Sequence, residues 1–131
     1  MKKDRLLNPL ILQEVAALGH TEYLCICDCG LPVPRGVRVI DISVTAGIPP
    51  FLDVLKVVEE ELVVESIILA SEIEKANPQL SQAVRNIFGD LPCEMVNHEE
   101  FKKYVEDAKC VIRTGETSAY ANVILVGGVN F

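Results

Sequence analysis

The sequence predicts an α/β fold: a single three-layer α/β/α domain over residues 1–131, with a mostly parallel or mixed sheet of about six strands. Two observations predict this fold. Short apolar runs alternate along the chain with segments whose apolar residues recur at helical spacing, which is the pattern of a sheet covered by helices. The chain also has 131 residues, a length typical of one domain, with no internal repeat and no linker-like tract.

The expected helices have apolar faces and recognisable ends. Asn8 followed by Pro9 is an N-cap followed by a first-turn proline, and Gly19 provides a C-terminal residue that easily adopts a left-handed turn. Asn77 and Pro78 should separate two helical segments, because proline cannot donate to the helix hydrogen-bond ladder. The helices are therefore expected at residues 9–18, 51–61, 71–76, 79–88 and 98–108.

The expected strands are short and mostly apolar. Tyr23–Cys27 is almost entirely apolar, as in strands that are covered on both faces. Turn-forming residues follow it at Gly30–Pro34, and a second turn at Gly47–Pro50 follows the next strand. The strands are expected at residues 23–27, 37–43, 63–70, 94–97, 109–113 and 122–126.

Composition and charge argue against several classes of partner. With 12 Lys and Arg against 19 Asp and Glu, the chain has a formal charge of −7, which repels nucleic-acid phosphates. Its apolar runs are far shorter than the ~20 residues that span a bilayer. The five cysteines are an odd number and favour free thiols in a reducing compartment. We therefore expect a cytoplasmic protein with neither a nucleic-acid nor a membrane partner.

The two histidines are candidates for moving protons. His20 follows the end of the first expected helix, where the helix dipole favours a positive charge, and His98 stands where a strand hands over to a helix. The structural alternative for each is a surface or capping histidine.

Polar residues that end strands are candidates for binding a ligand. Asp28 closes the strand 23–27, and ligands of open α/β sheets bind at the carboxyl ends of strands. Asp28 could equally bond the backbone of the Gly30 turn. The segment from Arg113 to Asn122 is dense in groups that can grip a polyhydroxylated ligand, although a hairpin turn with one surface ion pair would explain it as well.

Two further groups are expected to be structural. Cys25, Cys27 and Cys29 alternate along one expected strand, with about 7 Å between one cysteine and the next. A zinc ion needs each of its sulfur ligands about 2.3 Å from the metal, which this spacing does not favour. For Asp41 we expect an ion pair with a nearby arginine, such as Arg35 or Arg38. No metal site and no cofactor is indicated.

Motifs spread along the whole chain point to a family. They are Leu18-Gly-His-Thr-Glu22, Cys27-Asp-Cys-Gly-Leu-Pro-Val-Pro34, Gly47-Ile-Pro-Pro-Phe51, Asn77-Pro-Gln-Leu80, Val111-Ile-Arg-Thr-Gly-Glu116 and Tyr120-Ala-Asn-Val-Ile-Leu125. In this order they resemble the D-ribose pyranase family, from Met1 to Phe131. The L-fucose mutarotases are similar in the Gly-His, Gly-Glu and Tyr-x-Asn elements. They differ in the Asp-x-Gly-Leu-Pro and Ala-Asn stretches, where this chain is similar to the ribose branch.

The resemblance implies a cytoplasmic isomerase that interconverts the β-pyranose and β-furanose forms of D-ribose without a cofactor, as a cyclic homo-oligomer. Carried over residue by residue, it implies that His20 is the acid and that the sugar is bound by Asp28, His98, Tyr120, Ala121 and Asn122. The alternatives are an L-fucose mutarotase, a non-catalytic sugar-binding accessory of ribose transport, or a thiol or metal protein built on the cysteines.

The chemistry and the chain geometry add two expectations. Opening a cyclic hemiacetal needs one proton delivered to the ring oxygen and one removed from the anomeric hydroxyl, a task that suits histidine near neutral pH. His20 precedes the strand 23–27 and Asp28 follows it, so the two should lie roughly 20 Å apart. One ribose cannot bridge that distance. We therefore expect a site shared across a subunit interface.

Overall fold

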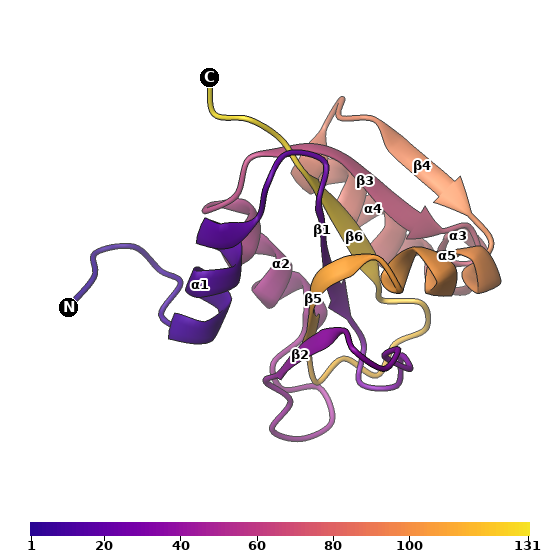
Figure 1. The fold of residues 1–131 in the computed structure, drawn as a ribbon. Helices are drawn as coiled ribbons and strands as arrows, with labels where there is room; N and C mark the ends of the chain where they lie inside the picture. Colours follow the sequence, from indigo (N-terminus) through magenta and orange to yellow (C-terminus); the bar gives the residue numbers. More distant parts are fainter.

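Six strands form one mixed sheet in the computed structural model, which describes residues 1–131 (Figure 1). The strand order is β2-β5-β1-β6-β3-β4. Strand β6 lies between β1 and β3 and runs antiparallel to both, while all other neighbours pair in parallel. The strands are β1 Tyr23–Cys27, β2 Arg38–Asp41, β3 Val64–Ala70, β4 Cys93–Val96, β5 Ala108–Arg113 and β6 Val123–Gly127.

Five helices connect and cover the strands: α1 Pro9–Ala17, α2 Phe51–Glu59, α3 Ile73–Ala76, α4 Pro78–Phe88 and α5 His98–Val105. The Asn8 side chain caps α1 by accepting from the amides of Leu10 and Ile11, and Pro78 begins α4 as the sequence predicts. None of these helices combines the length and the apolar character that crossing a membrane requires.

Two element boundaries depart from prediction at places where a polar side chain bonds the backbone. Strand β2 ends at Asp41 and not at residue 43, because the Asp41 carboxylate accepts from both the amide and the hydroxyl of Ser43. The turn after α1 has its left-handed residue at Thr21, with φ of 66°, and not at Gly19. There the Glu22 carboxylate accepts from the Gly19 amide at 2.8 Å.

The helices cover the two faces of the sheet unequally, which confirms the three-layer prediction and refines it. Side chains alternate between the faces of a strand, so Leu24 and Ile26 of β1 enter one apolar core and Cys25 and Cys27 enter the other. Helices α1, α2, α3 and α4 pack on the first core, and α5 packs on the second. Figure 1 shows the same division.

The parallel strands give the sheet two chemically different edges. The carboxyl ends of β1 to β5 meet at one edge, where β6 begins, and we call this the carboxyl edge. The amino ends of the same strands meet at the opposite edge, where β6 ends, and we call this the amino edge. His20 precedes β1 at the amino edge, whereas Asp28 follows β1 at the carboxyl edge.

Candidate functional site

A cavity of about 370 Å³ opens at the carboxyl edge and contains three of the residues singled out from the sequence. Asp28, His98 and Tyr120 line it, together with Gly30–Pro32 and Ala119. Cavities that bind small molecules typically measure about 300–1,000 Å³. Side chains that are distant in the sequence meet here because the ends of β1, β4 and β5 and the start of β6 share this edge.

Asp28 closes the turn at Gly30 and also faces the cavity. One carboxylate oxygen accepts from the Gly30 amide at 2.9 Å and closes the turn, while the side chain also lines the cavity. The Asp28 amide donates to the side-chain oxygen of Asn122 at 2.9 Å. That bond fixes the orientation of Asn122, which is buried and whose Nδ2 has no partner within the chain. Ala121 beside it is fully buried.

His98 is held at the first turn of α5. Its amide donates to both carboxylate oxygens of Glu72, at 3.1 and 2.9 Å. Burial alone would raise the pKa of Glu72, but the hydrogen bonds from the His98 amide, the Glu72 amide and the Ser71 hydroxyl together outweigh it, and the pKa falls below its ordinary value. The His98 ring stacks on Phe101 and meets the edge of Tyr120 at 5.2 Å between centroids. Its Nδ1 is buried without a partner.

Tyr120 occupies a loop whose backbone is constrained. Its φ of 55° lies in the left-handed region, which is uncommon for a residue other than glycine and recurs at functional sites. Asn77, at the junction of α3 and α4, donates through its side-chain amide to the Ser118 hydroxyl at 3.0 Å and to the Ala119 carbonyl at 2.9 Å. Sequence reasoning used Asn77 only as a helix boundary and missed this support of the loop.

The polar residues that precede this loop are structural. Arg113 pairs with Asp41 at 3.3 Å and donates to the Leu31 carbonyl. The expected pairing of Asp41 with Arg35 or Arg38 is therefore wrong. Asp41 and Arg113 are register partners in the β2–β5 ladder, which places their side chains together, and Arg38 pairs instead with Glu14 at 2.7 Å.

Glu116 lies against the start of α2. Its carboxylate accepts from the Phe51 amide at 3.0 Å and from the Ser118 amide at 3.2 Å. Burial would raise the pKa of Glu116, but these and neighbouring hydrogen bonds lower it below its ordinary value of 4.5. The carboxylate thus takes the place of a helix cap.

His20 lies at the amino edge and does not line this cavity. Its Nε2 is 2.8 Å from a carboxylate oxygen of Glu65 at the start of β3. The turn that carries it is bonded to the end of β6: the Thr21 amide donates to the Gly127 carbonyl at 2.8 Å, and the Gly127 amide donates to the Glu22 carbonyl at 2.9 Å.

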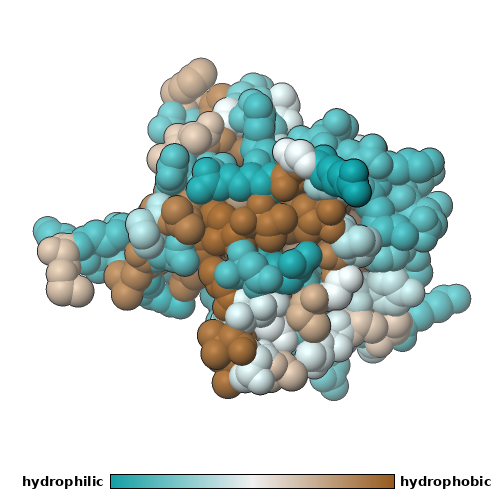
Figure 2. All heavy atoms as spheres, turned by 60° about the horizontal axis from the view of Figure 1, so that its bottom comes forward, coloured by the Kyte–Doolittle hydropathy of each residue, from teal (hydrophilic) through white to brown (hydrophobic).

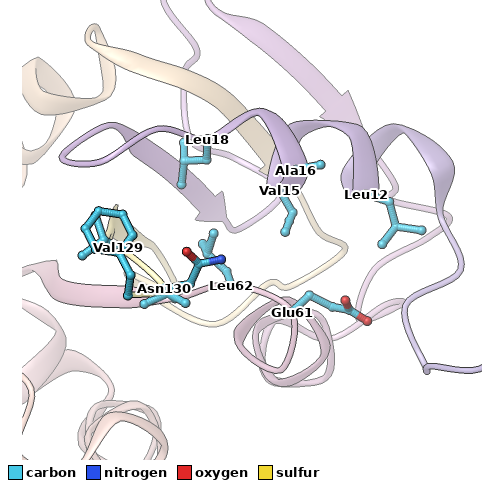
Figure 3. A pocket seen from close by; sticks show the side chains of 11 residues that line it. Leu12, Val15, Ala16, Leu18, Glu61, Leu62, Val129 and Asn130 are labelled. Carbon is cyan, nitrogen blue, oxygen red and sulfur yellow. The ribbon is translucent and has the colours of Figure 1, made fainter.

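A groove of about 440 Å³, lined mostly by apolar residues, adjoins the His20 turn (Figure 3). One wall is the face of α1 with Leu12 and Val15, and the other wall contains Leu62 and the segment Gly128–Phe131. Leu18, two residues before His20, also lines it.

The cysteines form no reactive cluster. Cys25 and Cys27 are buried in the core beneath α5, and Cys29 lies beyond the end of β1, so the three do not share one strand as the sequence suggested. Burial raises the pKa of Cys27 to about 12 and that of Cys25 well above its ordinary value. Such thiols stay protonated at neutral pH, whereas nucleophilic or metal-binding cysteines need thiolate character.

The fold and the two edges define a class of protein: the chain belongs to the RbsD / FucU transport protein family, whose sequence pattern matches residues 1–130. Among its relatives, the D-ribose pyranase of Geobacillus thermodenitrificans is 49% identical over 131 residues, covering 100% of this chain and 99% of that protein. The D-ribose pyranase of Bacillus velezensis is 49% identical, with 100% of both chains covered.

Solved structures give the same picture. The structure of Bacillus subtilis RbsD complexed with D-ribose is 46% identical and superimposes with a TM-score of 0.96 over 100% of both chains. The fucose mutarotase from Streptococcus pneumoniae, in complex with L-fucose, has a TM-score of 0.81 at 21% identity, covering 95% of this chain and 94% of that one. At that identity the likeness extends to the fold alone.

Proposed function

We propose that this protein is an isomerase that interconverts the β-pyranose and β-furanose forms of D-ribose. The observation that carries the proposal is the end-to-end similarity, at 49% identity, to relatives named D-ribose pyranase. A relative that is 46% identical and has the same fold is solved in complex with D-ribose. This sugar matches the proposed substrate.

The cavity at the carboxyl edge is the proposed sugar-binding site. Asp28 offers a carboxylate, Tyr120 a phenol, and His98 and Asn122 each have a buried polar atom without a partner. A buried polar group without a partner is costly, and a ligand rich in hydroxyl groups supplies the missing hydrogen bonds. Ala121 contributes the short backbone link between Tyr120 and Asn122. These five residues form the proposed sugar-binding site, in which Asp28, His98 and Tyr120 line the cavity and the buried Ala121 and Asn122 lie behind them.

His20 is the proposed acid that donates a proton to the ring oxygen as the hemiacetal opens. The proton of the anomeric hydroxyl passes to a water molecule at the same time, and the open aldehyde forms. Closure by a different hydroxyl repeats both transfers in the reverse sense, so the protons balance over the cycle. General acid–base help of this kind is typically worth ~10²–10⁴-fold in rate.

The sugar site is proposed to be shared between copies of the chain in a homo-oligomer. His20 and Asp28 stand at opposite ends of β1, roughly 20 Å apart along the strand. The His20 side chain is 54% exposed and most residues that line the groove beside it are apolar, as expected of a surface that meets another copy. Val39, Val44 and Ile48 are further exposed apolar residues, on β2 and the loop after it. Strand β2 and this loop lie at the bottom of Figure 1, which is turned forward in Figure 2, and apolar side chains gather on the face seen there.

The direct test is saturation-transfer NMR on D-ribose with sub-stoichiometric protein. We expect the wild type to accelerate pyranose–furanose exchange, and His20→Ala to abolish the acceleration while still binding ribose. A protein that binds ribose without changing the exchange rate would be a sugar-binding accessory. A faster exchange on L-fucose than on D-ribose would make it a fucose mutarotase.

Mixing two inactive variants tests the shared site. His20→Ala and Asp28→Asn each spoil one half, and in randomly reassembled oligomers about one quarter of the shared sites contain two intact halves. Activity should therefore recover to about one quarter of the wild-type rate. No recovery, with both variants assembled as the wild type, would place both residues in one chain's site.

We also propose a cytoplasmic location, which suits the five free cysteines.

A further inference from the structure

Glu65 is the one side chain that holds the His20 ring by a hydrogen bond. The His20 Nε2 lies 2.8 Å from the Glu65 carboxylate, although the residues are 45 positions apart in the sequence. A carboxylate only accepts hydrogen bonds, so Nε2 must carry the hydrogen in this pair. The second ring nitrogen, Nδ1, is then left for other partners.

The backbone of β3 is irregular at the point where it presents Glu65. The β3–β6 register shifts between Val64 and Ser66: Val64 pairs with Gly127, and Ser66 pairs with Val126. Irregularities of this kind leave one residue unpaired and turn its side chain away from the regular alternation. Glu65 is that residue, and its carboxylate reaches the turn before β1.

The turn that carries His20 is fixed from two other sides. Thr21 and Glu22 are bonded to Gly127 of β6. The Glu22 carboxylate accepts from the Gly19 amide at 2.8 Å and pairs with Lys109 at 3.1 Å. These contacts hold the backbone, so the main freedom that His20 retains is rotation of its own side chain.

We propose that Glu65 is a positioning residue for the proton transfer: it holds the imidazole with Nε2–H directed at its carboxylate, so that Nδ1 is the nitrogen that exchanges protons with the sugar. This inference rests on the proposed function, in which His20 is the acid. Glu65 touches only the imidazole and serves the reaction through it. The contact joins two partly exposed side chains, at 54% and 41% of their surface, and pairs of that kind contribute little to stability. Its use therefore lies in orientation.

The test compares Glu65→Ala and Glu65→Gln with the matched control Glu60→Gln. Glu60 forms a similar exposed pair with Arg5, at 3.0 Å, away from His20. We expect Glu65→Ala to lower kcat for ribose exchange by about 10- to 100-fold with KM nearly unchanged, because small misplacements of a reacting group cost this much. Glu65→Gln keeps an oxygen that accepts from Nε2–H and should restore most of kcat. The control should keep the wild-type kcat.

A spectroscopic measurement checks the ring itself. In ¹⁵N-labelled wild-type protein, the His20 imidazole should carry its hydrogen on Nε2 and show a proton signal protected from solvent exchange, which Glu65→Ala should lose. Wild-type kcat in Glu65→Ala, an equal loss in Glu60→Gln, or a neutral His20 ring whose single hydrogen is on Nδ1 would each overturn the assignment. If the wild type itself does not accelerate exchange, the proposed function fails, which is a different result from an active wild type with an equally active Glu65→Ala.

Discussion

Replacing Gly127 with alanine tests how firmly the His20 turn must be held. A Cβ at this position would lie 2.6 Å from the Gly19 carbonyl oxygen and 3.2 Å from the Leu18 side chain, whereas ordinary contacts begin near 3.4 Å. The turn or the end of β6 must therefore move by roughly 0.8 Å, because packed protein interiors leave no slack to absorb the methyl group. This shift would displace the His20 imidazole from its place.

The expected effects follow from that displacement. Overpacking of this size typically costs about 1–3 kcal/mol of unfolding free energy. A misplacement close to 1 Å costs about 10²-fold in rate, so ribose exchange should fall by about that factor. Urea unfolding measures the first quantity, and saturation-transfer NMR well below the unfolding temperature measures the second.

A core variant separates misplacement from instability. Val84→Ala opens a cavity at a fully buried position of α4, and we expect it to lose about 2 kcal/mol of unfolding free energy while keeping the wild-type exchange rate. A Gly127→Ala protein with the wild-type rate would refute the reasoning, and so would a Val84→Ala protein that is as slow as Gly127→Ala.

Two further expectations concern titration. The pKa of Glu116 is lowered in the folded protein, so the stability it contributes should be complete above about pH 4.5 and be lost as the pH falls through the lowered pKa. Urea unfolding midpoints measured down to acidic pH should therefore fall less steeply for Glu116→Gln than for the wild type. Parallel curves for the two proteins would contradict this. Burial raises the pKa of Cys27 to about 12, whereas Cys29 is exposed. An aromatic disulfide reagent should therefore modify Cys29 in the native protein and reach Cys27 only after denaturation. Rapid labelling of Cys27 in the native protein would contradict its burial.

The sequence was sufficient for the elements and for one half of the candidate site. Helix α1 has a local signal, the Asn8 cap and the following proline, and β1 has a continuous apolar run. Asp28 could be placed at the carboxyl edge because ligands of open sheets bind where strands end. Such signals are local in sequence, and they do not depend on how the strands are ordered.

The partners of the site residues could not be predicted, because they depend on strand order and register. Asp41 meets Arg113 only because β2 pairs with β5 in a particular register. Glu65 reaches His20 only because β6 is inserted beside β3 with a local irregularity. A single sequence contains no pattern that indicates either pairing. In the sequence, Asp41 and Glu65 look like ordinary charged positions.

In the shared site proposed above, strand β6 sets a length that constrains how copies of the chain can be arranged. Asn122 precedes this strand and Gly127 ends it, so its five residues separate the proposed sugar cavity from the histidine turn, by about 16 Å of extended backbone. The length of β6 thus fixes the distance between the cavity and the histidine turn. A neighbour whose strands run in the same direction can complete the cavity only if it is staggered by about one strand length, whereas a neighbour running in the opposite direction completes it when level. The span of one strand therefore limits the symmetries that an assembly can adopt.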